Sequence, residues 1–384
     1  MQATAQGWLV LDLTNSPAAL GAVSALQTLP ILLFSVFAGV LADRVDRRRL
    51  LAGTQLFAAS VALGLAVLAT TGAVELWHVM ALALLAGTAS AVQTPAYQAI
   101  VSTLVRREAI GSAVALNAAQ FNLSRILGPA LAGGVIAAGG LELAFWGNAF
   151  ALALVAWVFW TLKLAPASEL ARAEASLWAN LLDGFRYVRS ERMILVLVLL
   201  AGVPALFVLN YLVLLPVYAR DVLGIGAPGL GLLSGGVGIG ALAGALGLAA
   251  FRPSGGSGRS LLAGLGLGSL ALVVFALSRS VPLSIAALIL LGSSQVAYYA
   301  TTNTLLQLLV PGRLRGRVIS LYILTSWGFI PFGNLLAGVV AERFSATVAL
   351  AAGGLITLAV VAAVAAAYPA LRRLEAPAPS FATD

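Results

Sequence analysis

Uninterrupted apolar runs of about 20 residues constrain the fold of this chain more than any other feature. A helix of that length crosses the roughly 30 Å hydrocarbon core of a bilayer. Within lipid, every backbone N–H and C=O needs an internal partner, so only helices and closed barrels can span it. Barrel strands alternate apolar and polar residues, whereas these runs are continuous. The sequence therefore predicts an all-α membrane protein.

The composition excludes several function classes. Hydrophobic residues make up 61% of the 384-residue chain and charged residues only 9%, against about 25% charged in soluble domains. The formal net charge is +8, but the basic residues lie in short loops, so they indicate membrane topology and not nucleic-acid binding. There is no cysteine, and the single histidine, His78, lies beside Trp77 at an expected membrane interface. We therefore expect a structural role for His78, and neither a metal site nor a cofactor.

Charged and turn-forming clusters divide the chain into twelve apolar segments. They run over residues 2–12, 17–42, 50–71, 76–104, 109–139, 142–164, 191–219, 226–251, 260–278, 281–310, 316–341 and 345–371. Of the 22 Lys and Arg residues, eighteen fall in one set of alternate loops, and three, Arg220, Arg279 and Arg343, fall in the opposite set. The positive-inside rule places the first set and both termini in the cytoplasm, as expected for a multi-pass protein of the bacterial inner membrane.

The first segment is short for a transmembrane helix. Residues 2–12 make about 16 Å of helix, about half of the hydrocarbon core. An even number of spans still requires a crossing here. We therefore expect the natural chain to begin earlier, and residues 1–12 to pack against the interior of the helix bundle.

The polar stretch 165–190 separates two halves, 1–164 and 191–373, and a cytoplasmic tail expected to be disordered follows at 374–384. Ser176 can cap a helix, and apolar residues recur at helical spacing after it. This pattern predicts an amphipathic helix on the cytoplasmic membrane surface. A plain linker is also compatible with it.

The two halves are related in sequence. Residues 87–135 align with 292–340 at a constant shift of 205, which pairs Gly87 with Gly292 and Gly128 with Gly333. Duplicated halves are a recurring plan of secondary transporters, whose substrate site lies between the repeats near the bilayer midplane. We therefore predict two pseudo-symmetric six-helix bundles, with about twelve transmembrane helices of which the first is incomplete.

A charged motif at the end of the second segment is the most specific signal. It reads Gly39-Val-Leu-Ala-Asp43-Arg44-Val-Asp46-Arg47-Arg48-Arg49 and is called the gating loop below. An acid at a membrane boundary followed by a tight basic turn suits a charge-based latch, because a helix N-terminus favours negative charge and arginines pair with acids or lipid phosphates. A simple positive-inside cluster explains the arginines, but not Gly39 and Asp43 at this spacing.

In this loop the chain resembles the major facilitator superfamily, whose signature has the form G-x-x-x-D-R/K-x-G-R-R/K, except that Asp46 replaces the second glycine. Within the superfamily it is similar to the enterobactin-exporter-like, or transmembrane secretion effector, group. The phrases that carry this likeness are Trp8-Leu-Val, Leu13-Thr-Asn-Ser16-Pro, Leu41-Ala-Asp43-Arg-Val-Asp-Arg-Arg48 and Arg125-Ile-Leu-Gly128-Pro129-Ala-Leu. The likeness covers essentially the whole chain and implies transport by alternating access.

The fifth segment carries the motif Gly128-Pro129-Ala-Leu-Ala-Gly133-Gly134. Proline removes a backbone hydrogen bond, and glycines allow a neighbouring helix to approach closely. The resemblance implies export, because exporters of the superfamily carry a similar motif here. Ala132 stands where the first glycine of a pair is expected. An ordinary kinked helix is the alternative.

Polar residues within the apolar segments are the candidates for a substrate cavity. Arg125 is the one charge well inside a segment after the first, and an embedded arginine either binds an anionic substrate or holds a helix pair through carbonyl groups. The other candidates are Asn117, Asn122, Tyr97, Asn210, Tyr298, Asn303 and Trp327. Each of them alone also fits a role in helix packing.

Two features that the resemblance would imply are missing from this sequence. The fourth-helix arginine of the superfamily would fall at Ala83, ahead of Gly87. No carboxylate lies at mid-depth either, and in the resembled group an acid lies just upstream of the point where this chain starts. Proton coupling is therefore implied by the resemblance and not by these residues.

The leading interpretation is a monomeric, proton-coupled exporter of a drug-like or siderophore-like small molecule, with the substrate, protons and the lipid bilayer as its partners. A membrane-embedded enzyme would need a nucleophile–base set or a metal, and one histidine, no cysteine and no paired mid-membrane carboxylates argue against it. A sensor or scaffold that keeps the transporter fold without turnover remains open.

Overall fold

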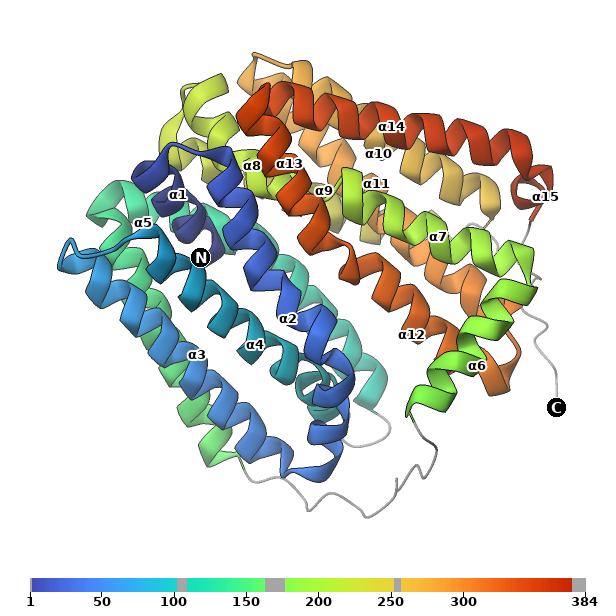
Figure 1. Cartoon of the computed structure of the whole chain (residues 1–384), viewed down its shortest axis with the longest axis horizontal. Helices are drawn as coiled ribbons and strands as arrows, with labels where there is room; N and C mark the ends of the chain where they lie inside the picture. The colour runs from blue at the N-terminus through green and yellow to red at the C-terminus, as the bar shows by residue number, and fades with distance from the viewer. Residues whose placement is uncertain (1, 102–108, 163–176, 252–256, 375–384) are drawn as a thin grey trace. The chain divides into compact units, whose positions relative to one another are not determined.

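The computed structural model describes residues 2–101, 109–162, 177–251 and 257–374. Within those ranges the protein consists of helices joined by short turns, without a β-strand (Figure 1). The side chains of some helical residues, including 35–40 and 42–44, lie outside the described part.

The helices of the first half are α1 (Gln2–Thr14), α2 (Pro17–Arg44), α3 (Arg47–Thr70), α4 (Leu76–Val101) and α5 (Ile110–Thr161). After these come α6 (Leu177–Ser190), α7 (Arg192–Phe207), α8 (Tyr211–Val217), the π-helical turn η2 (Tyr218–Val222) and α9 (Gly226–Phe251). The remaining helices are α10 (Gly258–Leu277), α11 (Val281–Leu309), α12 (Gly312–Gly328), α13 (Ile330–Arg343), α14 (Ala346–Ala367) and α15 (Pro369–Arg372).

Ten helical stretches of the described chain are long and apolar enough to cross a membrane. This number agrees with the twelve expected segments, because one of them is too short to be counted and two others are joined in one helix. α1 has 13 residues, about 20 Å of helix, and is too short to be counted. The segments expected over 109–139 and 142–164 are joined in α5 and counted once. The prediction of an all-α membrane fold is confirmed.

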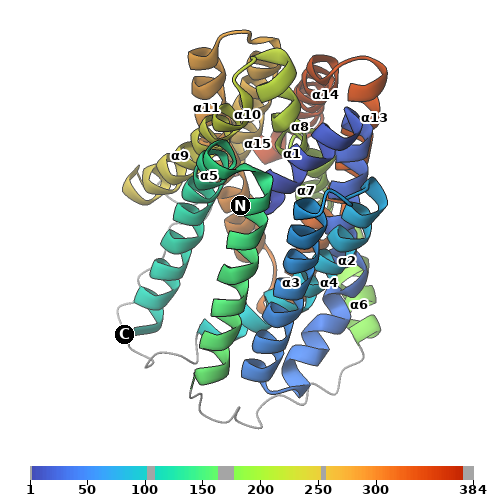
Figure 2. The same ribbon diagram turned by 90° about the vertical axis from the view of Figure 1, so that its left-hand side faces the viewer.

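α5 is two helical arms joined at a glycine pair. Gly139 (φ −146°, ψ 18°) and Gly140 (φ 78°, ψ −179°) depart from helical geometry in its middle. The backbone region of Gly140 is open essentially to glycine only. Figure 2 shows the two arms, teal and green, meeting at this break. The pair therefore makes the turn that the sequence predicts between the fifth and sixth segments.

The same helix pairings recur in both compact units of the chain. One unit comprises Met1–Glu174 with Leu215–Leu232, and the other comprises Ala175–Leu214 with Leu233–Asp384. In the first unit α3 packs on α4 and α5, and α2 lies beside α4 (Figure 1). In the second unit α10 packs on α11 and α14, and α9 lies against α11.

Two glycines that the sequence repeat aligns make equivalent contacts. A Cβ atom at Gly87 in α4 would overlap the carbonyl oxygen of Gln27 in α2. A Cβ atom at Gly292 in α11 would overlap the carbonyl oxygen of Val237 in α9. Glycine at both positions lets the paired backbones approach this closely. The repeat detected in the sequence therefore corresponds to a repeated helix–helix contact.

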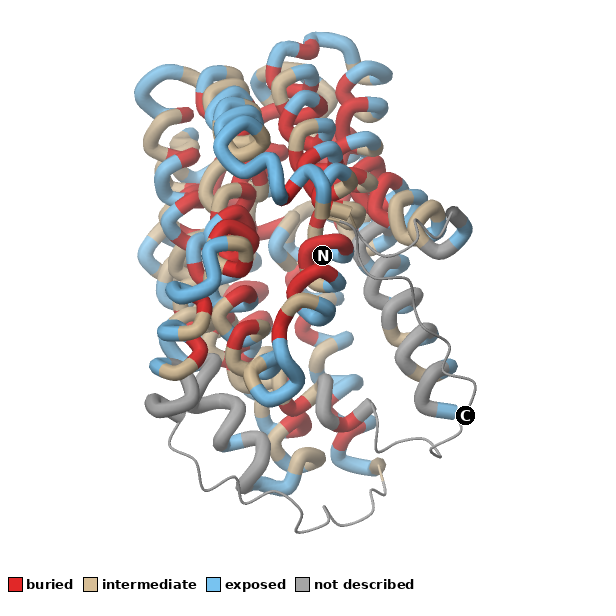
Figure 3. The backbone as a smooth tube through the Cα atoms, turned by 90° about the vertical axis from the view of Figure 1, so that its right-hand side faces the viewer, coloured by how far each residue is buried: buried red, intermediate tan, exposed pale blue. Residues whose placement is uncertain are grey.

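Large apolar side chains remain exposed on several helices. Phe150, Trp157 and Trp160 in α5 are 71%, 63% and 63% exposed. Buried and exposed positions alternate along the coloured parts of the helices in Figure 3, so these parts have a packed face and an open face. Apolar surface of this extent is unfavourable in water, so the open faces belong against lipid.

α1 packs on α5 as expected for the first residues of the chain. Asn148 in α5 donates a side-chain hydrogen bond of 2.8 Å to the Gln2 amide oxygen. The buried side chains of α1 are Ala5, Gln6, Leu9, Val10 and Leu11. The Gln6 amide nitrogen has no hydrogen-bond partner among the described residues, so α1 carries one unsatisfied buried donor.

Candidate functional site

The gating loop joins α2 to α3, and Asp46 sets its local structure. The Asp46 carboxylate accepts a hydrogen bond of 2.9 Å from the Arg49 backbone N–H. This contact caps the N-terminus of α3, where the first N–H groups lack intrahelical partners. Asp46 has a φ of −53°, and a negative φ does not require glycine. The departure from the expected glycine is therefore explained by a helix cap.

Arg48 anchors the gating loop to the end of α5. Its guanidinium donates a hydrogen bond of 3.1 Å to the carbonyl oxygen of Leu162, the C-cap residue of α5. Helix C-termini favour cations because their last carbonyls lack partners and carry partial negative charge. Gly39, Asp43 and Arg44 lie in the last turns of α2, and their side chains lie outside the described residues. Their role as a latch stays a prediction, as does that of Arg47, which is half-buried.

The motif of the fifth segment makes a close helix contact at Gly133. A Cβ atom there would lie 2.8 Å from the Ala227 carbonyl oxygen at the start of α9, closer than side chains pack. Gly128 and Pro129 are half-buried within α5, whereas Ala132 is fully buried. The small side chain of Ala132 therefore preserves the close packing that a glycine at this position of the motif would allow. The link between this motif and export stays untested.

Two of the cavity candidates meet in the structure. The hydroxyl group of Tyr97 in α4 donates a hydrogen bond of 3.0 Å to the side-chain oxygen of Asn117 in α5. Both residues are half-buried. Among the described residues, no partner is found for the side-chain N–H groups of Asn117, and several neighbouring side chains of α5 lie outside the described residues. The pair therefore joins two polar side chains of α4 and α5 within the first compact unit.

Asn210 and Tyr298 are buried and connect helices of the second unit. The Asn210 amide nitrogen donates to the Leu206 carbonyl at 3.1 Å and reaches the Gly333 carbonyl of α13 at 3.5 Å. The Tyr298 hydroxyl in α11 donates to the Leu200 carbonyl of α7 at 2.8 Å. Such bonds satisfy polar atoms in apolar surroundings. This geometry favours the packing alternative for Tyr298, whereas the Asn210 side-chain oxygen is buried without a partner among the described residues, so both alternatives stay open for Asn210.

The remaining candidates are not brought together by the described structure. Asn303 accepts a hydrogen bond of 2.6 Å from Gln307, one turn later in α11. Trp327 in α12 is 57% exposed. The side chains of Asn122 and Arg125 lie outside the described residues, so the two alternatives for Arg125 both stay open.

A charged cluster around Arg220 was not singled out by the sequence pattern. Arg220 lies in η2, and π-helical turns occur frequently at functional sites. Its guanidinium donates a hydrogen bond of 3.1 Å to the Leu11 carbonyl oxygen and another to the Asn15 side chain. It also pairs with Asp221 at 2.6 Å. The cluster lies within the first compact unit.

Asp12 completes this Arg220 cluster, which comprises Leu11, Asp12, Asn15, Arg220 and Asp221. The Asp12 carboxylate lies within electrostatic range of Arg220. One sequence signal could have pointed to the cluster. Arg220 is one of three basic residues in the loops that the charge asymmetry assigns to the periplasmic side. The positive-inside rule disfavours arginine on that side, so such a residue is expected to have a specific partner.

The family described as transmembrane secretion effector matches residues 1–381 of the chain. This match extends from α1 through α15 and thus over both repeats.

Curated relatives include three bacterial transport proteins. The staphyloferrin A transporter of Staphylococcus aureus (strain NCTC 8325 / PS 47) is 37% identical over 131 residues, which is 34% of this chain and 33% of that protein. The multidrug efflux pump Tap of Mycolicibacterium fortuitum is 28% identical over 347 residues, 87% of this chain and 83% of that protein. Macrolide efflux protein A of Streptococcus pyogenes is 30% identical over 119 residues, 31% of this chain and 29% of that protein. Two of these matches therefore span about a third of the relative's length.

Solved structures of transporters share the fold. The nucleoside transporter NupG superposes with a TM-score of 0.74 at 16% identity, covering 98% of this chain and 95% of that one. The inward open xylose transporter XylE from E. coli gives a TM-score of 0.71 at 11% identity, covering 94% and 91%. At such identities the likeness concerns the fold alone, and it confirms the major facilitator architecture predicted from the sequence.

Proposed function

The chain belongs to the transmembrane secretion effector family of the major facilitator superfamily, and from this premise we propose that it exports a small molecule by alternating access. It is a multi-pass membrane transporter. The observation that carries the proposal is the family match over residues 1–381, because transport by this architecture needs both repeats.

The relatives support the direction of transport and the substrate class. Two of them are described as efflux proteins, one for macrolides and one for multiple drugs, and a third as a staphyloferrin A transporter. We propose a drug-like or siderophore-like molecule as the substrate of this chain. Tyr97 and Asn117 are its proposed contacts, because they form a hydrogen-bonded polar pair within two apolar helices.

The charge asymmetry of the loops supports a cytoplasmic location for both termini in the bacterial inner membrane. On this topology the gating loop lies at the cytoplasmic end and the Arg220 cluster at the periplasmic end. We propose that the protein acts as a monomer with these two regions as its gates. Arg48 holds the gating loop in place while Asp43 and Arg44 form the latch, and Arg220 closes the opposite end.

Proton exchange is the proposed energy source. Asp12 is the first candidate for the coupling acid, because it lies in α1 beside the Arg220 guanidinium. Proton binding to Asp12 would reduce its attraction to Arg220 and so connect protonation to the periplasmic gate. Replacement of Asp12 by Asn would then leave binding intact while removing the dependence of export on the proton gradient.

Export is tested in cells that lack their own drug exporters. Cells producing the chain should accumulate less radiolabelled macrolide than control cells, and a protonophore should abolish the difference. Asp43→Asn should restore accumulation while the amount of protein in the membrane stays unchanged. Equal accumulation with and without the chain, for macrolides and for staphyloferrin A alike, would refute the proposed substrate class.

Topology is tested by reporter fusions at residue 170 and after Asp384. Both should report the cytoplasm if the charge asymmetry sets the orientation. A periplasmic signal at one position alone would overturn the proposed span count, and periplasmic signals at both positions would exchange the assignment of the two gates.

A further inference from the structure

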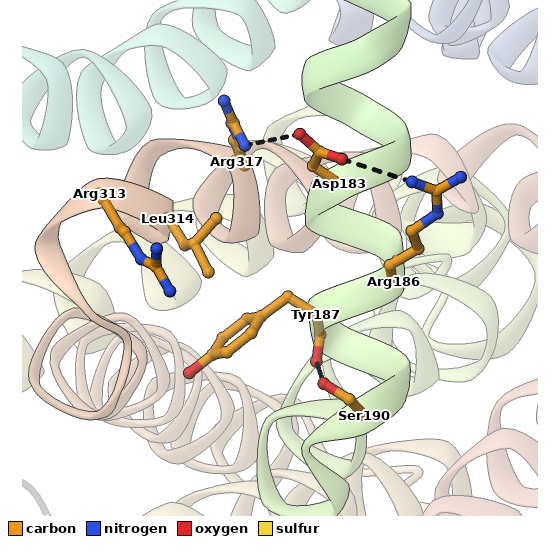
Figure 4. Close-up of a pocket in the computed structure, with 7 residues that line it drawn as sticks. All are labelled: Asp183, Arg186, Tyr187, Ser190, Arg313, Leu314 and Arg317. Atoms are coloured by element: carbon orange, nitrogen blue, oxygen red, sulfur yellow. Dashed lines mark hydrogen bonds and ion pairs between the residues drawn. The ribbon is translucent and has the colours of Figure 1, made fainter.

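A second charged site lies between α6 and the first turns of α12, within the second compact unit. It is an open hollow of about 630 Å³ (Figure 4). Its lining consists of Asp183, Arg186, Tyr187 and Ser190 from α6, and Arg313, Leu314 and Arg317 from α12. This hollow is called the α6–α12 cradle below.

The walls of the cradle are held together by packing and by charge. A Cβ atom at Gly184 would lie 3.0 Å from the Arg317 Cβ atom, so α6 rests directly on α12. Val188 and Val318 on the same two helices are buried in one hydrophobic cluster. The Asp183 carboxylate accepts a hydrogen bond of 2.9 Å from Arg317. The cradle is therefore preformed by the contact between the two helices.

The cradle carries a surplus of positive charge. Three arginines face one aspartate, and Asp183 is shared between Arg317 at 2.9 Å and Arg186 at 3.7 Å. Arg313 has no ion pair or hydrogen bond with any described residue, and Tyr187 lines the same hollow (Figure 4). Guanidinium groups with a nearby hydroxyl are the donors that recognise phosphate oxygens.

An exposed apolar surface borders the cradle on α6. The lining residues of α6 follow the spacing i, i+3, i+4 and i+7 and so share one helix face. Leu182 and Phe185, each 55% exposed, lie on the next face around the helix. Amphipathic helices of this kind lie in the membrane interface with their apolar face among the acyl chains. A molecule bound in the cradle can therefore be charged at one end and apolar at the other.

We propose that the α6–α12 cradle binds the phosphate of an anionic phospholipid headgroup in the cytoplasmic leaflet. Arg186, Arg313 and Arg317 surround the phosphate, and the acyl chains lie against Leu182 and Phe185. The site goes beyond the proposed transport function, because lipid binding there attaches α6, in the segment between the two halves, to the membrane surface. The combination of surplus charge with adjacent apolar surface favours a lipid over free phosphate.

The full chain, purified in a neutral detergent, is titrated separately with phosphatidylglycerol, phosphatidylcholine and inorganic phosphate. Native mass spectrometry counts the retained lipids, and the midpoint of thermal unfolding reports binding. Phosphatidylglycerol should be retained and should raise the midpoint more than phosphatidylcholine. In the double variant Arg186→Gln/Arg313→Gln, the affinity for phosphatidylglycerol should fall by about fivefold for each arginine removed.

Arg315→Gln is the matched control, because Arg315 is exposed in the same turn of α12 but does not line the cradle. It should keep the affinity of the unmodified protein. Equal losses in the control and in the double variant, or equal retention of both lipids, would overturn the site. Inorganic phosphate that raises the midpoint as much as phosphatidylglycerol does would overturn the assignment to a lipid. None of these outcomes changes the result expected in the export assay. The lipid site and the export function are therefore tested separately.

Discussion

The Arg220 guanidinium donates a hydrogen bond of 3.1 Å to the Leu11 carbonyl oxygen, across 209 residues of sequence. The same carbonyl accepts a bond of 2.9 Å from the Asn15 backbone N–H, so both of its lone pairs are used. Asn15 also accepts from Arg220 through its side chain. The end of α1 and η2 are thereby joined at one guanidinium, which makes Arg220 the central residue of the proposed periplasmic gate.

Replacement of Arg220 should open this gate. Arg220→Gln removes the charge and the fork that reaches Leu11 and Asn15, and hydrogen bonds to charged groups contribute about 1.5–3 kcal/mol each. Because the chain has no cysteine, Leu13→Cys introduces a unique thiol beside the cluster. A membrane-impermeant maleimide should label it about tenfold faster in the Arg220→Gln background, a factor that corresponds to about 1.4 kcal/mol.

Arg279→Gln serves as the control for that experiment. Arg279 is another arginine of the sparsely charged loops and is exposed. Its replacement should change neither labelling nor export. Labelling rates that are the same in the Arg220→Gln and Arg279→Gln backgrounds would show that the cluster does not hold the gate closed.

The close contact at Gly133 predicts a loss of stability on enlargement. Gly133→Val places atoms against the Ala227 carbonyl, and overpacking of this kind costs about 1–3 kcal/mol. Gly134→Val is the matched control, because a Cβ atom at Gly134 meets nothing within 4 Å. The midpoint of thermal unfolding in detergent should fall for Gly133→Val only. A similar fall in both variants would indicate that helix propensity, and not the contact with α9, sets the effect.

Two aspartates of the gating loop should separate stability from transport. Asp46→Ala removes the cap of α3 and should lower stability by about 1 kcal/mol, whereas Asp46→Asn keeps an acceptor and should be close to neutral. Asp43→Asn should lower export without a change in thermal stability or membrane insertion, because Asp43 is assigned to the latch. Unchanged export in Asp43→Asn would reduce the loop to a topology signal.

The Tyr97–Asn117 pair should behave as a unit in substrate binding. Tyr97→Phe and Asn117→Ala should each raise the KM for export severalfold, and the double variant should add little to either single change, as for residues in contact. Gln120→Ala, an exposed position in α5, is the control. A fall in thermal stability with an unchanged KM would assign the pair to helix packing.

Features that depend on local sequence could be predicted, and those that depend on distant partners could not. The length of the apolar runs predicts the helices, and the alignment of residues 87–135 with 292–340 predicts two related bundles, in which Gly87 and Gly292 make equivalent contacts. The partner of Tyr298 is the backbone carbonyl of Leu200, which has no signature in the side-chain pattern. Arg220 likewise reaches a carbonyl 209 residues away.

The gating loop lies between these two cases. Its helix ends could be placed from the sequence, since a basic turn follows an apolar run. The cap at Asp46 could have been recognised, because aspartate is among the preferred N-cap residues. The signature of the superfamily has glycine at that position, so the resemblance alone marks Asp46 as a departure and does not predict its capping role.

Transport into membrane vesicles of defined orientation tests the central claim most directly. Inside-out and right-side-out vesicles are prepared from cells that produce the chain, and an imposed proton gradient drives uptake of radiolabelled macrolide or staphyloferrin A. Export predicts accumulation in inside-out vesicles, loss of that accumulation with a protonophore, and a reduced rate in Asp43→Asn. Accumulation only in right-side-out vesicles would contradict the account, because it would make the protein an importer.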